Sequence, residues 1–171
     1  PKSRAEPVLV NATGTIYAGE RLAVYASYTE GLEESPIAPD NAVNRNVAAP
    51  ALNTEQYDAG VRWTVTGNMK LIAGVFHIEK PYFDLDPGGM FRELGTVEHN
   101  GIELSLAGNP VERLTLLAGA RFLDAEVSGP VVDAGVIGQK PVGSAKRYAV
   151  ASADYAIANT GLSVDAVVEN I

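Results

Sequence analysis

The sequence contains no cysteine and only two histidines. Without cysteine there is no disulfide framework, no thiolate-bound metal and no cysteine nucleophile. His77 and His99 have no carboxylate or second histidine at a spacing typical of a metal site, and histidine ligation requires several convergent groups. We therefore expect neither a metal nor a cofactor, whereas the cellular compartment stays open on cysteine content alone.

Positive charge and long apolar runs are also scarce. The chain has 13 Lys and Arg against 21 Asp and Glu, a formal net charge of -8, and its basic residues form no cluster. Phosphate binding requires such clusters, so we expect no nucleic-acid partner. The N-terminus lacks the basic and apolar stretches of a signal peptide, and no segment reaches the roughly 20 apolar residues of a membrane helix.

Catalytic motifs are missing as well. The serines lack a nucleophile-elbow context, and the many carboxylates have no histidine or lysine base at a plausible site. Asp84 and Asp86 beside Gly88 could hint at a calcium loop, but the remaining ligands of such a loop are absent, which favours a solvated turn. The sequence predicts a protein that is not an enzyme.

Apolar and small or polar residues alternate with period two along almost the whole chain, which predicts an all-β fold. The clearest case places Tyr57, Ala59, Val61 and Trp63 on one face and Gln56, Asp58, Gly60 and Arg62 on the other. The expected strands cover residues 7–18, 21–32, 54–65, 69–83, 91–107, 113–127, 146–157 and 162–171. In the strand from residue 69, Ile72, Phe76 and Ile78 form the apolar parity, opposite His77 and Glu79.

The connections between these strands alternate in length. Tight turns are expected near Gly19, Gly67, Asn109 and Asn159, and long loops at residues 33–52 and 129–143. Membrane barrels have this asymmetry, with short periplasmic turns and longer extracellular loops. The expected strands of about 10–13 residues also exceed the usual 5 or 6 of soluble sheets and match tilted membrane strands.

Two environments remain possible for the apolar face: the core of a soluble, lipocalin-like ligand-binding barrel, or membrane lipid around a polar lumen. Most aromatic residues lie near the expected strand ends, as in an interfacial girdle: Tyr17, Tyr25, Tyr28, Tyr57, Trp63, Tyr82, Phe83 and Tyr155. The last expected strand, 162–171, stops without a turn to a further strand, which leaves an exposed unpaired edge of the kind that complete proteins avoid. These features favour a fragment of a membrane barrel.

Five segments, in the same order, resemble barrel segments of TonB-dependent siderophore receptors. They are LAVYASYTEGLE at residues 22–33, TEQYDAGVR at 54–62, FHIEKP at 76–81, GTVEHNGIELS at 95–105 and PVG at 141–143. The resemblance covers most of the chain. It implies an antiparallel up-and-down transmembrane β-barrel fragment of about eight strands, from the C-terminal part of a larger, 22-stranded barrel.

The resemblance also implies a function. Such receptors lie in the outer membrane of Gram-negative bacteria, where a TonB-type inner-membrane complex grips a short N-terminal box and drives uptake of ferric siderophores. Residues 1–171 would then be a partial barrel domain, with the plug, the box and the final strands absent. The expected partners are a ferric siderophore, the TonB-type complex and outer-membrane lipid. A soluble lipocalin-like barrel and a passive porin-type or adhesin barrel stay open as alternatives.

Residue roles follow within this resemblance. Gly60, Gly74, Gly101 and Gly119 would permit close backbone approach in a curved wall, and Asp58, Arg62, Glu103 and Arg121 would face the lumen. The candidate ligand-binding residues are Tyr28, Tyr82, Phe83 and Phe91, because aromatic walls suit a siderophore pocket. A place in the interfacial girdle or in loop packing would select the same four residues. The loops at 33–52 and 129–143 and the connection at 84–89 are expected to emerge on one side.

Overall fold

A computed structural model describes residues 8–141 and 143–171. Eight strands form one sheet: β1 (Asn11–Tyr17), β2 (Leu22–Glu33), β3 (Leu52–Thr66), β4 (Met69–Leu85), β5 (Phe91–Val111), β6 (Leu114–Ser128), β7 (Arg147–Ala156) and β8 (Ser163–Asn170). One short helix, α1 (Pro130–Asp133), lies between β6 and β7. The all-β, antiparallel prediction is confirmed.

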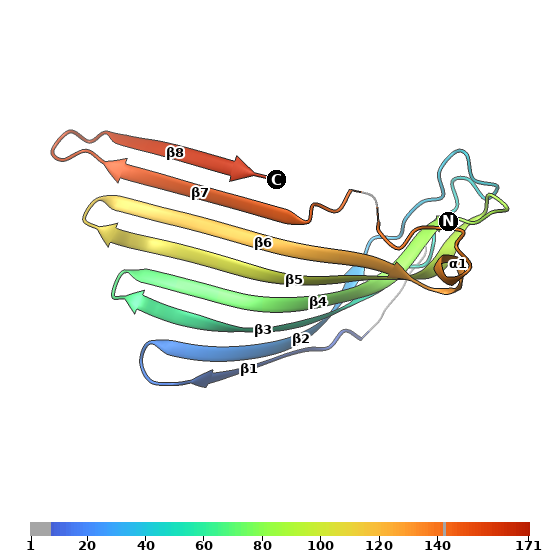
Figure 1. The fold of residues 1–171 in the computed structure, drawn as a ribbon, viewed down its shortest axis with the longest axis horizontal. Helices are drawn as coiled ribbons and strands as arrows, with labels where there is room; N and C mark the ends of the chain where they lie inside the picture. Colours follow the sequence, from blue (N-terminus) through green and yellow to red (C-terminus); the bar gives the residue numbers. More distant parts are fainter. Residues whose placement is uncertain (1–7, 142) are drawn as a thin grey trace.

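The strands follow one another in the sheet in chain order, and each pairs antiparallel with the next. Figure 1 shows a curved wall with the tight turns β1–β2, β3–β4, β5–β6 and β7–β8 at one end and the long loops with α1 at the other. Within the described residues β1 and β8 do not pair, so these strands do not close into a small barrel. No described helix has both the length and the apolar character needed to cross a membrane.

The register gives the sheet two different faces, because residues directly opposite each other point to the same side. One row runs through Ala59, Val75, Ile102 and Phe122, in four neighbouring strands. Val75, Ile102 and Phe122 are each at least half exposed. We call the side that carries this row, with Trp63 and Leu104 in neighbouring rows, the apolar face.

The opposite side, which we call the polar face, carries the four charged residues predicted to share one surface. Glu103 pairs directly with Arg121, Asp58 pairs with Ser27, and Arg62 pairs with Ile72. The pairing of Arg62 with Ile72 shows that the alternating pattern of β4, taken alone, assigned the wrong side of this strand to the apolar face. Ile72, Phe76 and Ile78 belong to the polar face, because the register of the neighbouring strands, and not the apolar parity of β4, decides which side is apolar.

Glycines on the polar face are covered by aromatic rings. The hydroxyl of Tyr25 lies 2.7 Å from the position that a Cβ would take on Gly60 and 2.9 Å from that on Gly74, and the ring of Phe76 occupies the same position over Gly101. The Arg62 guanidinium lies 4.6 Å from the centroid of the Tyr25 ring. Close approach is therefore confirmed at Gly60, Gly74 and Gly101, and Tyr25 is a polar-face residue and not part of an apolar girdle.

Toward the long loops, the apolar face ends in a row of acidic residues. Glu30, Glu55, Glu79, Glu98 and Glu126 stand directly opposite one another in five consecutive strands. Like charges in direct cross-strand positions destabilise a sheet. This row marks the level at which the apolar part of the wall ends.

Several element boundaries differ from the sequence prediction. β4 and β5 continue to Leu85 and Val111, because their cross-strand pairing persists beyond the alternating segments. The first strand begins at Asn11; residue 7, where we expected it to start, lies outside the described residues. Pro130 starts α1 within a segment predicted to be an irregular loop, and its fixed φ suits the first turn of a helix.

Candidate functional site

The long-loop end of the sheet carries three connections: the loop at residues 34–51, the β4–β5 turn at residues 86–90 and the loop at residues 129–146. Because the sheet is antiparallel and up-and-down, all three emerge at the same end (Figure 1). This is the arrangement that the alternating loop lengths predicted. Residues on such loops are commonly the ones that bind ligands.

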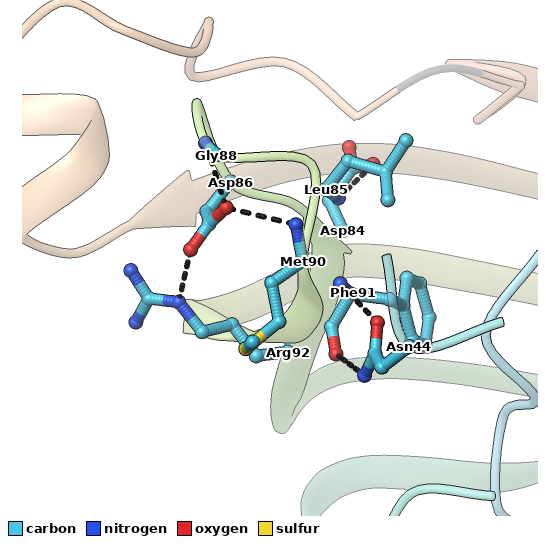
Figure 2. A network of polar contacts seen from close by, with 8 residues as sticks. All are labelled: Asn44, Asp84, Leu85, Asp86, Gly88, Met90, Phe91 and Arg92. Carbon is cyan, nitrogen blue, oxygen red and sulfur yellow. Dashed lines mark hydrogen bonds and ion pairs between the residues drawn. The ribbon is translucent and has the colours of Figure 1, made fainter. Parts of the chain in front are cut away.

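The β4–β5 turn is organised by Asp86 (Figure 2). Its Oδ1 accepts the backbone amides of Gly88 at 2.9 Å and Met90 at 3.0 Å, and its Oδ2 accepts Nε of Arg92 at 2.7 Å. The hydrogen bond from Arg92, followed by those from the amides, holds the pKa of Asp86 below its usual range. Asp86 therefore uses its oxygens to close the turn, as the solvated-turn interpretation requires.

The loop at residues 34–51 folds on itself and is not an extended connection. Ile37 and Ala48 form an isolated bridge, the amide of Ala38 donates to the carbonyl of Val47, and the amide of Asn46 donates to the carbonyl of Ala38. Ala38 is almost completely buried within this fold. The loop consequently presents a defined shape.

Asn44 joins this loop to the β4–β5 hairpin. Its Nδ2 donates to the carbonyl of Phe91 at 2.8 Å, and its Oδ1 accepts the amide of Phe91 at 2.9 Å (Figure 2). Beside it, the amide of Val43 donates to the carbonyl of Gly89 at 2.8 Å. The two segments, separated by 47 positions in the chain between Asn44 and Phe91, thus meet along one edge.

The base of the same loop is fixed by an ion pair. Nζ of Lys80 lies 3.0 Å from Oε2 of Glu33, and the hydroxyl of Thr54 donates to Oε1 of Glu33 at 3.2 Å. These contacts connect the end of β2 to β3 and β4. The loop at 34–51 is therefore held at its base and at its tip.

The third loop packs through α1 against the wall. Val132 of α1 joins Val97 and Val127 in a small buried cluster, with Tyr82 and Ile137 packed against it. Because Val97 and Val127 pair on the polar face, the loop covers that face of β5 and β6. Farther along this loop, Lys140 binds Asp124 and Glu126 at 2.6 and 2.9 Å.

The four candidate ligand-binding residues fall into three neighbourhoods. The rings of Phe83 and Phe91 pack with centroids 5.9 Å apart at the hairpin that Asn44 binds. Tyr82 lies in the α1 cluster, where burial and a hydrogen bond to Asp84 raise its pKa to about 12. Tyr28 stands apart on the apolar face, with its ring centroid 4.9 Å from that of Tyr57 and its hydroxyl on Glu30, a position that suits the girdle.

In the part of the chain that the structure describes, no three His, Cys, Asp or Glu side chains come together in a way that could hold a metal ion. His77 pairs with Asn100 on the apolar face, whereas His99 lies on the polar face. Sequence reasoning missed Asn44 and Arg92 as organising residues. Asn44 carries no distinguishing signal among the polar residues of its loop, since its partner is a backbone group far away in the chain.

Comparisons with known proteins agree with this geometry. A family model described as TonB dependent receptor-like, beta-barrel, matches residues 11–167. The chain belongs to this family. Proteins with this barrel lie in the outer membrane of Gram-negative bacteria and are receptors and transporters, so the apolar face meets lipid, the polar face meets the lumen, and the long loops are extracellular.

Individual relatives are consistent with the assignment. The ferrichrome receptor FcuA of Yersinia enterocolitica is 28% identical over 144 residues, which are 81% of this chain and 19% of that protein. The ferric preacinetobactin receptor BauA of Acinetobacter baumannii has a TM-score of 0.64 at 29% identity, over 85% of this chain and 22% of that one. The ferric-catecholate import receptor Fiu of E. coli K12 matches in fold, with a TM-score of 0.68 at 19% identity over 93% and 24% of the chains. The chain thus spans about a fifth of these relatives.

Proposed function

We propose that this chain is part of an outer-membrane receptor for energy-coupled uptake of a ferric siderophore. One observation carries the proposal: the loop at 34–51 and the β4–β5 turn form one interlocked extracellular surface on a wall of this family. Two relatives at 28% and 29% identity, named as receptors for ferrichrome and for ferric preacinetobactin, support the same ligand class.

The strands and the extracellular loops have different roles in this proposal. The strands supply the lipid-facing wall, and the extracellular surface holds the siderophore. Phe83 and Phe91 are candidate contacts, beside the edge where Asn44 binds the β4–β5 hairpin. Passage of the ligand and coupling to a TonB-type complex belong to plug and N-terminal regions outside this chain. The open sheet of the described strands does not favour the lipocalin-like alternative.

The proposal is tested in the complete receptor by removing residues Ile37 to Val47. Ile37 lies beside Ala48, so a short linker can close the gap without stretching β2 or β3. We expect the affinity for the cognate ferric siderophore to fall, with surface expression unchanged. The measurement is binding of radiolabelled ferric siderophore to whole cells, with surface-exposed receptor quantified in parallel.

The matched control widens the periplasmic turn at Gly67 and Asn68 by two glycines. This turn lies at the opposite end of the sheet from the loops, so the affinity should stay nearly unchanged. Equal losses in both variants, or no loss from the loop deletion, would show that these loops do not form the recognition surface. Uptake that continues after collapse of the proton gradient would instead identify a passive pore.

A further inference from the structure

We propose that Asn44 is a positioning residue, a latch that makes the loop at 34–51 and the β4–β5 hairpin act as one rigid recognition surface. The identity of the ligand rests on the proposed function, whereas the contact between Asn44 and the hairpin is seen in the structure. Asn44 would act on affinity through Phe91 and not by touching the siderophore.

The Asn44 side chain makes the same two hydrogen bonds that a neighbouring strand would make. A carboxamide offers a donor and an acceptor side by side, as a peptide group does, and Asn44 uses both on a single residue, Phe91. Phe91 is the first residue of β5, where cross-strand pairing to β4 starts at Leu85. Asn44 therefore continues the sheet edge by one side chain, and the Val43–Gly89 backbone hydrogen bond extends the contact.

Each side of the latch has internal hydrogen bonds of its own. The loop has its own internal hydrogen bonds around buried Ala38, and the hairpin turn is closed by Asp86. Among the described residues, the hydrogen bonds that join the loop to the hairpin are those made by Val43 and Asn44. Loss of the Asn44 side chain should leave the loop and the hairpin folded and joined by the Val43–Gly89 backbone hydrogen bond, so that the two segments separate more readily.

This separation has a defined effect on binding. If only the latched arrangement accepts the ligand, the apparent dissociation constant rises by the inverse of the latched fraction. The loss then falls on the association rate, because the bound complex keeps its contacts. A residue that touches the ligand would instead change the dissociation rate.

The experiment uses the complete receptor with the substitutions Asn44→Ala and Asn44→Asp. The aspartate keeps the size of the side chain but places an oxygen where Nδ2 donates to the Phe91 carbonyl. We expect both variants to lose about tenfold in affinity for the ferric siderophore, mostly in the association rate. Asn68→Ala, in a periplasmic turn, is the matched control and should bind as the wild type does.

A disulfide then replaces the latch. A Cβ on Gly89 would lie 3.5 Å from Cγ2 of Val43, which is where a cysteine sulfur would stand. The chain contains no other cysteine, so Val43→Cys with Gly89→Cys can be oxidised selectively within it. In the Asn44→Ala background, oxidation should restore affinity and reduction should remove it again. The same cysteine pair with Asn44 intact controls for strain at Gly89, whose φ is +76°.

Failure of the latch and failure of the proposed function give different results. Hydrogen exchange at the Phe91 amide needs no ligand and should accelerate in Asn44→Ala; unchanged exchange would overturn the latch. An oxidised disulfide that forms but restores no affinity would also overturn it, because Asn44 would then act by direct contact. A wild-type receptor that binds no ferric siderophore, with ferrichrome and ferric preacinetobactin among those tried, would refute the proposed function, while the exchange measurement still decides the latch.

Discussion

Substituting Gly60 by alanine should destabilise the barrel wall, whereas the same change at Gly119 should not. A Cβ on Gly60 would lie 2.5 Å from the carbonyl oxygen of Ala73 and 2.7 Å from the hydroxyl of Tyr25. Backbone of the neighbouring strand cannot move aside without disturbing the register, so we expect the substitution to cost about 1–3 kcal/mol, as overpacking does. At Gly119 the nearest atoms are 3.7 and 3.8 Å away, which is ordinary contact.

The matched pair makes the reasoning refutable. Gly119→Ala should leave the free energy of unfolding unchanged or raise it by about 0.5–1 kcal/mol, because alanine loses less backbone entropy on folding. The assay is denaturant unfolding of the complete receptor in detergent micelles, followed by circular dichroism. Adding Tyr25→Phe to Gly60→Ala should recover only part of the loss, since the Ala73 carbonyl remains. Equal unfolding free energies for the two glycine variants would show that the close approach over Gly60 is not real.

Three further predictions concern charge and environment. Glu98→Gln should raise the melting temperature at low ionic strength by relieving repulsion within the glutamate row, and the gain should shrink in 1 M salt; a salt-independent effect would exclude this cause. The pKa of Asp86 is lowered in the folded chain, so the contribution of this carboxylate to stability is complete above about pH 4 and disappears as the pH falls through the folded pKa. The Met90 amide, which donates to Asp86, should therefore lose protection from hydrogen exchange only in strong acid, and loss already at pH 6 would contradict this. A fluorophore on Trp63→Cys should be quenched from the lipid phase, and Asp58→Cys should react with a water-soluble reagent. Equal access from water at both positions would argue against a membrane wall.

The sequence predicts some parts of the extracellular surface and not others. The loop lengths alone predicted that the loop at 33–52 and the connection at 84–89 emerge on the same side, because antiparallel strands of alternating direction leave no other arrangement. They could not predict Asn44, because its two hydrogen bonds go to a backbone group whose position depends on where β4 and β5 stop. Tyr28 and Tyr82 have similar sequence contexts, near strand ends, yet the structure separates them onto opposite faces.

The sequence by itself determined the strand content, the alternation of short turns and long loops, and which residues of β3 share a face, since period-two patterning is a local property of the chain. Only the tertiary structure decided which face of β4 meets lipid. Its apolar parity, Ile72, Phe76 and Ile78, lies on the lumen side, because pairing with β3 and β5 fixes the register cooperatively across the sheet. The glutamate row and the rings over Gly60 and Gly101 have the same origin, since each joins residues from separate strands that no local pattern relates.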